Sequence, residues 1–109
     1  MGISTHVLDI ARGRPAEGIE VRIDRLEKDG HWRPVGRGTT DQDGRVSGLL
    51  DAAALELADY RVYFRLEEYL GPACFFPEAT IHFRVTEPTQ HYHVPLLLSP
   101  FGYSTYRGS

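Results

Sequence analysis

Cysteine is almost absent from this chain of 109 residues, since Cys74 is the only one. A single thiol cannot form a disulfide within the chain, and its setting in PACFFPE predicts a small buried hydrophobe rather than a nucleophile. Long apolar runs are missing too: no stretch approaches the roughly 20 residues that cross a bilayer, and MGISTHVLDI lacks the pattern of a secretory signal. We therefore expect a cytoplasmic protein with no membrane partner.

An excess of basic residues is also lacking. The 12 Lys and Arg residues are outnumbered by 15 Asp and Glu residues, which gives a formal net charge of -3. This balance offers no electrostatic reason to expect nucleic acid as a partner. The length suits one domain over residues 1–109, with enough surface buried on folding for one core.

What dominates the sequence is an alternation of apolar and polar residues, which is typical of half-buried strands. The segments GIEVRID, YRVYFRL and ATIHFRV all show it, and turn clusters rich in Gly, Pro and Asp separate such runs. We expect an all-β sandwich with strands at about 4–10, 18–27, 31–39, 45–49, 60–66, 79–86, 91–98 and 102–107.

Helical candidates are few and short. LLDAAALELAD has a helix-forming composition but no full amphipathic repeat. LEEYLG is long enough for one or two turns, which Gly71 and Pro72 would end. The fold class is therefore all-β with one short helix.

Both faces of the expected strand at 91–98 are largely apolar. Successive side chains of a strand point to opposite faces, so Tyr92, Val94, Leu96 and Leu98 share one face and His91, His93, Pro95 and Leu97 share the other. STHVLDI shows a similar pattern, with Val7 opposite His6 and Leu8. A second apolar face in so short a chain requires a cover. We expect an oligomer whose interface covers the faces that bear His6 and His93.

Three histidines are candidates for chemistry. His91 and His93 project from one strand face, and this spacing can supply two zinc ligands. His6 would be the third ligand if the two strands are neighbours. The alternative for His6 is an interface imidazole bonded to backbone, and no carboxylate or thiolate stands at a recognisable partner spacing.

The segment DQDGR resembles the start of a calcium loop, with Asp41, Asp43 and Gly44. A full loop needs Glu at its twelfth position, where this chain has Ala52. We predict a tight turn with Gly44 at positive φ. Arg45 follows, and its guanidinium is either solvated or placed to bind a planar anion.

Nucleophilic serine chemistry has little support. The chain has no G-x-S-x-G motif, and neither Ser104 nor Ser109 has a recognisable base. In YSTYRGS, Ser104, Tyr106 and Gly108 share one face if the strand is regular. Tyr106 either joins a polar site or is an ordinary strand aromatic. The residues alone indicate a small β-sandwich oligomer with an imidazole-rich cleft.

Four segments indicate a family. They are STHVLDIARGRPAEGI, TTDQDGR, FFPE and HYHVPLLLSPFGYSTYRGS, and they resemble the transthyretin-related 5-hydroxyisourate hydrolases of purine catabolism. The resemblance spans essentially the whole chain, although EEYLGPACFFPE is shorter than is usual before FFPE. The ending YRGS is the most specific mark, because transthyretin, a hormone carrier of the same fold, lacks both this ending and these histidines.

The resemblance implies a transthyretin-like sandwich of two four-stranded sheets. It also implies a homotetramer built as a dimer of dimers, with active sites in the channel between dimers and no metal or cofactor. The catalytic positions that it implies are His6, Arg45, His93, Tyr106 and Ser109. Of these, His6, Arg45 and Tyr106 also bind substrate, while His91 and Arg107 have supporting roles.

The reaction implied is hydrolysis of 5-hydroxyisourate at its acyl C–N bond, which gives 2-oxo-4-hydroxy-4-carboxy-5-ureidoimidazoline in urate degradation. His93 and His6 would activate water and move protons, and Arg45 would hold the anionic ring and the attacked carbonyl. Tyr106 would orient the substrate, and Ser109 would contribute its hydroxyl or terminal carboxylate. The alternative is a transthyretin-like carrier that binds a planar aromatic ligand in the intersubunit channel without turnover.

Overall fold

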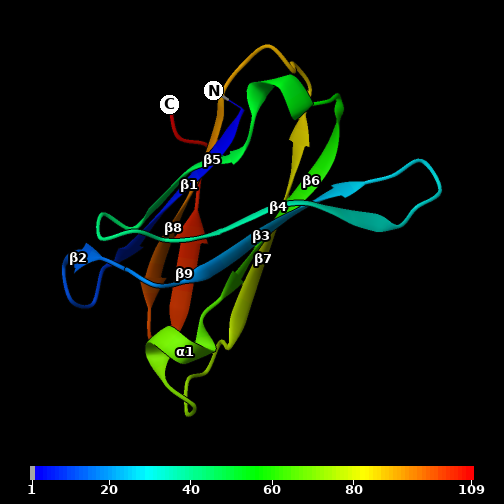
Figure 1. Ribbon diagram of the computed structural model, residues 1–109. Coiled ribbons are helices and arrows are strands. Elements are labelled where there is room, and N and C mark those ends of the chain that lie inside the picture. Colours follow the sequence, from blue (N-terminus) through cyan, green and yellow to red (C-terminus); the bar gives the residue numbers. More distant parts are fainter. Residues whose placement is uncertain (1) are drawn as a thin grey trace.

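The computed structural model describes residues 2–109, which form two β-sheets packed face to face (Figure 1). One sheet contains β1 (Ile3–Asp9), β2 (Arg14–Pro15), β5 (Arg45–Leu50), β8 (Tyr92–Ser99) and β9 (Gly102–Thr105). The other contains β3 (Glu20–Leu26), β4 (Trp32–Thr39), β6 (Ala58–Arg65) and β7 (Glu78–Val85). The expected all-β sandwich is confirmed.

The eight expected strands are all present, and β2 is an addition. This strand of two residues pairs with the end of β1, with Pro15 opposite Leu8. It lies in ARGRPAEG, whose Gly and Pro content predicts only a turn. The first sheet therefore has five strands rather than four.

The core lies between the sheets and follows the predicted alternation. In β1 every second residue is buried, beginning with Ile3, and the intervening side chains are half-buried on the outer face. In β6, Tyr60, Val62 and Phe64 are all fully buried. Each buried large apolar side chain contributes about 1.5–3 kcal/mol of transfer free energy. This burial fixes which face of β1 and β8 points outward.

One of the two helical candidates is shorter than its composition suggests, and the other forms the short helix that was expected. LLDAAALELAD forms only the 3₁₀ turn η1 (Ala52–Ala54), while Leu50 ends β5 and Leu55 is buried in the core. Without an amphipathic repeat, the segment has no helical face to bury. LEEYLG forms α1 (Glu67–Leu70), which ends at Gly71 with φ of 101°. No helix between residues 2 and 109 is long and apolar enough to span a bilayer.

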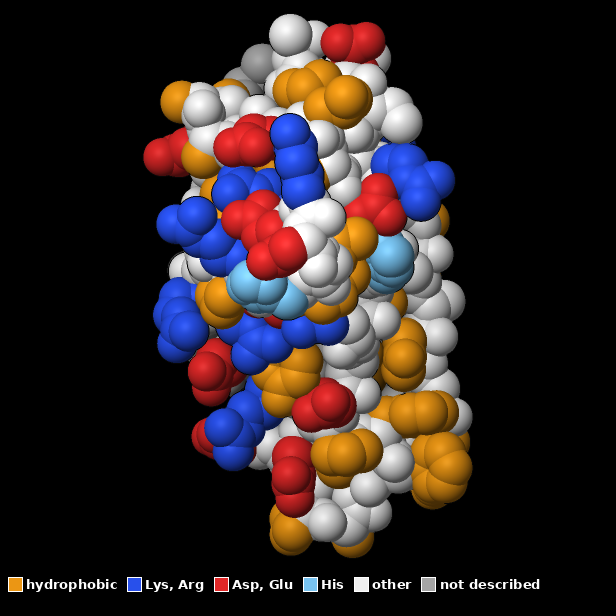
Figure 2. All heavy atoms as spheres, turned by 90° about the vertical axis from the view of Figure 1, so that its right-hand side faces the viewer, with side chains coloured by type: hydrophobic (Ala, Val, Ile, Leu, Met, Phe, Trp, Pro, Cys, Tyr) orange, Lys and Arg blue, Asp and Glu red, His pale blue; other side chains and the backbone are white. Residues whose placement is uncertain are grey.

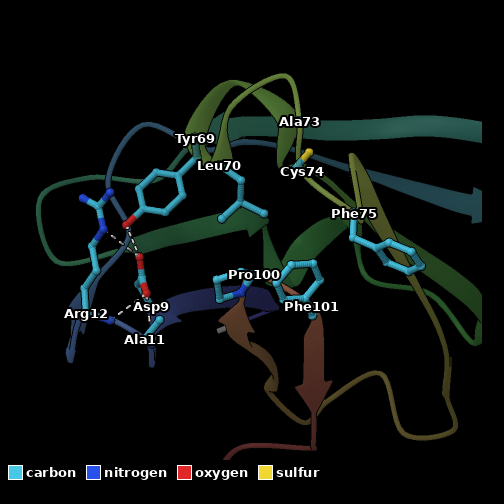
Figure 3. A pocket seen from close by; sticks show the side chains of 10 residues that line it. All are labelled: Asp9, Ala11, Arg12, Tyr69, Leu70, Ala73, Cys74, Phe75, Pro100 and Phe101. Atoms are coloured by element: carbon cyan, nitrogen blue, oxygen red, sulfur yellow. Dashed lines mark hydrogen bonds and ion pairs between the residues drawn. The ribbon is translucent and has the colours of Figure 1, made fainter.

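The end of the molecule beside α1 is rich in exposed aromatic side chains. Phe75 and Phe101 are 65% and 80% exposed, and Figure 2 shows orange side chains gathered at this lower end. A cavity of about 290 Å³ lies here, with Asp9 and Arg12 toward one end and the two phenylalanines toward the other (Figure 3).

Cys74 lines this cavity and is half-buried, so the expected core position is wrong. The short loop after α1 holds Cys74 at the rim rather than between the sheets.

Candidate active site

A pocket of about 160 Å³ opens on the outer face of the five-stranded sheet. Its lining joins residues from β1, β5, β8 and the end of the chain: Ser4, Thr5, Arg45, Ser47, His91, His93 and Ser109. The structure therefore brings together four of the candidate residues, Arg45, His91, His93 and Ser109.

Sheet pairing explains why segments so distant in sequence meet here. β1 runs parallel to β8, which places Ser4 opposite His93. β5 pairs antiparallel on the other side of β1 and places Arg45 opposite His6. Partners opposite one another share a sheet face, so these side chains lie on one surface. The His6 ring lies 6.5 Å from the His93 ring, centroid to centroid.

The turn before β5 positions Arg45. The backbone N–H groups of Asp43 and Arg45 donate to Asp41 Oδ1 over 2.9 and 3.0 Å. The bond from Arg45 is the main reason that the pKa of the Asp41 carboxyl lies below its ordinary value. Gly44 has φ of 75°, and a Cβ there would lie 2.4 Å from the Val7 carbonyl oxygen. The predicted tight turn is confirmed, and it joins the start of β5 to β1.

The imidazole of His93 has an environment that favours its neutral form. Burial lowers the pKa of His93 below its ordinary value. Positive charge on three neighbours lowers it further, and these are His6, His91 and Arg45. A neutral imidazole with a free ring nitrogen can accept a proton, so this environment suits a general base.

Ser4 is a residue of the pocket that the sequence reasoning missed. Its hydroxyl oxygen lies 3.0 Å from His91 Nε2 and 2.8 Å from His93 Nδ1. His91 Nδ1 is buried with no hydrogen-bond partner within residues 2–109. One signal was present, because Ser4 has the same parity as His6 in STHVLDI. The parallel pairing of β1 with β8 was not readable from the pattern.

The last residues of the chain dock against β8. The N–H of Gly108 donates to the His93 carbonyl oxygen over 2.8 Å. The guanidinium of Arg107 stacks over the Tyr92 ring at 4.3 Å and donates to Gln90 Oε1 over 2.9 Å. These contacts hold the tail against β8, and Ser109 at its end lines the pocket.

Tyr106 does not join this pocket within the single chain. Its ring is 57% exposed and lines another cavity, of about 290 Å³, together with Ile81, Tyr92 and Val94. β9 ends at Thr105, whose hydroxyl donates to the Pro95 carbonyl oxygen over 2.7 Å. The expected strand through residue 107 is therefore too long, and the alternation that placed Tyr106 beside the histidines stops before it.

The three histidines of the zinc alternative are not arranged around one point. His91 and His93 instead lie on either side of the Ser4 hydroxyl, with their rings 6.3 Å apart. In the described part of the chain, no three His, Cys, Asp or Glu side chains form a group that could hold a metal ion. The geometry is that of a hydrogen-bonded imidazole cluster beside an arginine.

Comparison with known proteins decides the family. The model of the HIUase/Transthyretin family matches residues 3–108. The chain belongs to this family. It is 46% identical over 110 residues to a 5-hydroxyisourate hydrolase of Salmonella typhi, covering 98% of this chain and 80% of the relative. It is 42% identical to the 5-hydroxyisourate hydrolase of Mus musculus, covering 98% of this chain and 94% of the relative.

Solved structures similar to this chain include both a 5-hydroxyisourate hydrolase and a transthyretin. The 5-hydroxyisourate hydrolase of Klebsiella pneumoniae superimposes with a TM-score of 0.84 at 33% identity, covering 100% of each chain. Sea bream transthyretin in complex with thyroxine superimposes with a TM-score of 0.93 at 28% identity, covering 99% of this chain and 95% of that one. Since the backbone fits both, the side chains of the pocket must distinguish the two functions.

Proposed function

We propose that this family member is a 5-hydroxyisourate hydrolase of urate degradation, with residues 1–109 acting as one catalytic domain. Relatives that are 38–46% identical over nearly the whole chain carry this name. The observation that carries the proposal is the pocket itself. Arg45 and His93 lie together in it, His6 is close by, and the surroundings of His93 favour its neutral form. This combination supplies a base and a fixed positive charge for attack by water.

The proposed reaction opens the ring of 5-hydroxyisourate at its acyl C–N bond. His93 Nε2 removes a proton from water as the oxygen attacks the acyl carbon. The C–N bond then breaks, and the departing ring nitrogen takes a proton from an imidazole, for which we propose His6, whose ring lies 6.5 Å from that of His93. Such base catalysis typically gives ~10²–10⁴-fold acceleration. The products are one carboxylate and the ureido group of 2-oxo-4-hydroxy-4-carboxy-5-ureidoimidazoline.

Arg45 is proposed to stabilise the negative charge that develops on the attacked carbonyl oxygen and to bind the anionic ring. A well-placed donor at this position is worth roughly 10²–10³-fold. Ser109 lines the same pocket and is proposed to contact the substrate. Tyr106 lies in a different cavity, so a role in orienting substrate requires a movement of the tail or a site shared with a second protomer.

We further propose a homotetramer that is a dimer of dimers. β7 and β9 are the last strands of their sheets on the same side of the molecule, and pairing with a second copy would continue both sheets (Figure 1). The outer face of β1 and β8, which carries His6 and His93, is then available for a second contact. Sedimentation at the monomer mass would contradict this assembly.

The proposed compartment is the cytoplasm, where a lone thiol such as Cys74 stays reduced.

A direct assay tests the proposed function. Freshly made 5-hydroxyisourate is generated from urate, and its ultraviolet absorbance is followed with and without the protein. We expect faster decay with the protein, and the same rate after prolonged chelation. A rate equal to the spontaneous one, together with ligand-dependent stabilisation by a planar aromatic compound, would favour the carrier alternative. Loss of activity on chelation, with bound zinc found by elemental analysis, would favour the zinc alternative.

The pH dependence follows from the lowered pKa of His93. The base must be neutral to act, so kcat/KM rises with pH as His93 loses its proton. Because the pKa lies below the ordinary value of about 6.5, the acid limb of the profile is centred below about pH 6.5. Measuring kcat/KM at constant ionic strength from about pH 5 to 8 checks this. An acid limb centred above about pH 6.5 would contradict the assignment of His93 as the base.

A further inference from the structure

The hydroxyl of Ser4 lies between two imidazoles. Its oxygen is 3.0 Å from His91 Nε2 and 2.8 Å from His93 Nδ1. We propose that Ser4 fixes the tautomer of His93, so that it is a positioning residue for the hydrolysis, and that His91 acts as the partner that receives its proton. This inference rests on the proposed function for its kinetic test, but the tautomer itself can be measured separately.

Proton counting restricts what this group of three side chains can do. A serine hydroxyl has one proton to donate, while a neutral imidazole has one N–H and one bare nitrogen. Ser4 can therefore donate to only one of the two rings and must accept from the other. The tautomers of His91 and His93 are coupled through this single oxygen.

Only one of the two arrangements leaves His93 ready to act as a base. If Ser4 accepts from His93 Nδ1–H and donates to His91 Nε2, then His93 Nε2 is bare and can take a proton from water. If both bonds reverse, His93 Nε2 carries the proton and can only donate. We assign the first arrangement to the resting protein.

Ser4 is the side chain that both rings share. His91 Nδ1 is buried and has no partner between residues 2 and 109, so the assigned arrangement leaves its N–H unpaired within the chain, and the bond from Ser4 is the contact that holds His91 in this tautomer. Ser4 is held opposite His93 by the parallel register of β1 and β8. The Nδ1 side of the His93 ring is occupied by Ser4, so the Nε2 side is left for the substrate.

The kinetic test uses Ser4→Ala, which removes one oxygen atom from a half-buried position. We expect kcat to fall by roughly 10- to 100-fold, the size usual for losing a hydrogen bond that orients a functional imidazole, while KM changes by less than about 2-fold. Ser4→Thr keeps the hydroxyl and should recover most of the activity. Ser104→Ala removes an exposed serine of the same sheet and serves as the matched control.

Two further measurements separate this role from a purely structural one. Long-range ¹H–¹⁵N spectra of the histidines should show His93 protonated on Nδ1 in the native protein and shifted toward the Nε2–H form in Ser4→Ala. His91→Phe removes the acceptor of the Ser4 proton, and the double variant with Ser4→Ala should lose no more activity than the more damaging single variant.

The outcomes are distinct. An Nε2–H tautomer of His93 in the native protein, or a Ser4→Ala variant with native kcat, would overturn the assignment. If the native protein does not hydrolyse 5-hydroxyisourate at all, the proposed function fails, and the spectra of the native and Ser4→Ala proteins still decide whether Ser4 sets the tautomer of His93.

Discussion

The variant His93→Ala is expected to lower kcat for 5-hydroxyisourate by roughly 10²–10⁴-fold, the range of a lost general base. The imidazole lies at the point where β1, β8 and the tail meet, and its low pKa keeps it neutral at physiological pH. Stopped-flow ultraviolet assays under single-turnover conditions separate this loss at the chemical step from any change in substrate binding. The rate of spontaneous substrate decay sets the lowest enzymatic rate that the assay can detect.

A matched histidine variant controls for general damage. His31 lies in the loop between β3 and β4, with its side chain 73% exposed and its Nδ1 2.9 Å from Asp29 Oδ1. His31→Ala should keep native kcat, and both variants should show native secondary structure and cooperative melting. A His93→Ala protein that still accelerates decay at the native rate would remove His93 from the mechanism and leave His6 as the candidate base.

The parts of the site that the sequence predicted depend on local patterns. The alternation along STHVLDI and HYHVPLLLS predicts which sheet face His6 and His93 occupy. The apolar side chains of each strand must face the core, so the histidines between them must lie on the outer face. The turn DQDGR predicts its own geometry, since Asp41 and Gly44 supply the acceptor and the positive φ. The resemblance of the ending YRGS added Ser109, which the structure places in the pocket.

The parts that were missed depend on pairing between distant segments. The Ser4 bond to His93 joins residues 89 positions apart, and no local pattern indicates which strand lies beside β1. Within the single chain Tyr106 lies outside the pocket, because the β9 ladder ends at Thr105 and resumes only as an isolated bridge between Gly108 and His93. Periodicity describes a regular strand and fails where pairing stops.

The tail supplies the second large effect. Gly108→Ala is expected to lower kcat/KM by about 10²-fold, the size usual for a displacement of about 1 Å in a catalytic group. A Cβ at this position would lie 2.5 Å from His93 Cδ2 and 3.2 Å from Cγ, so either the ring or the tail must move. The N–H of Gly108 is also bonded to the His93 carbonyl oxygen, which ties the tail to the same residue.

Gly102→Ala is the matched control, because a Cβ there would meet only Ser99 Oγ at an ordinary 3.7 Å. It should keep native activity.

Deletion of residues 106–109 should abolish activity but lower the free energy of unfolding by only about 1–3 kcal/mol. That loss corresponds to the exposed stacking of Arg107 on Tyr92 and the bond from Gly108 to His93. Denaturant titration and the ultraviolet assay on the same samples separate the two effects. A truncated protein that is folded and fully active would show that the tail is not part of the active-site wall.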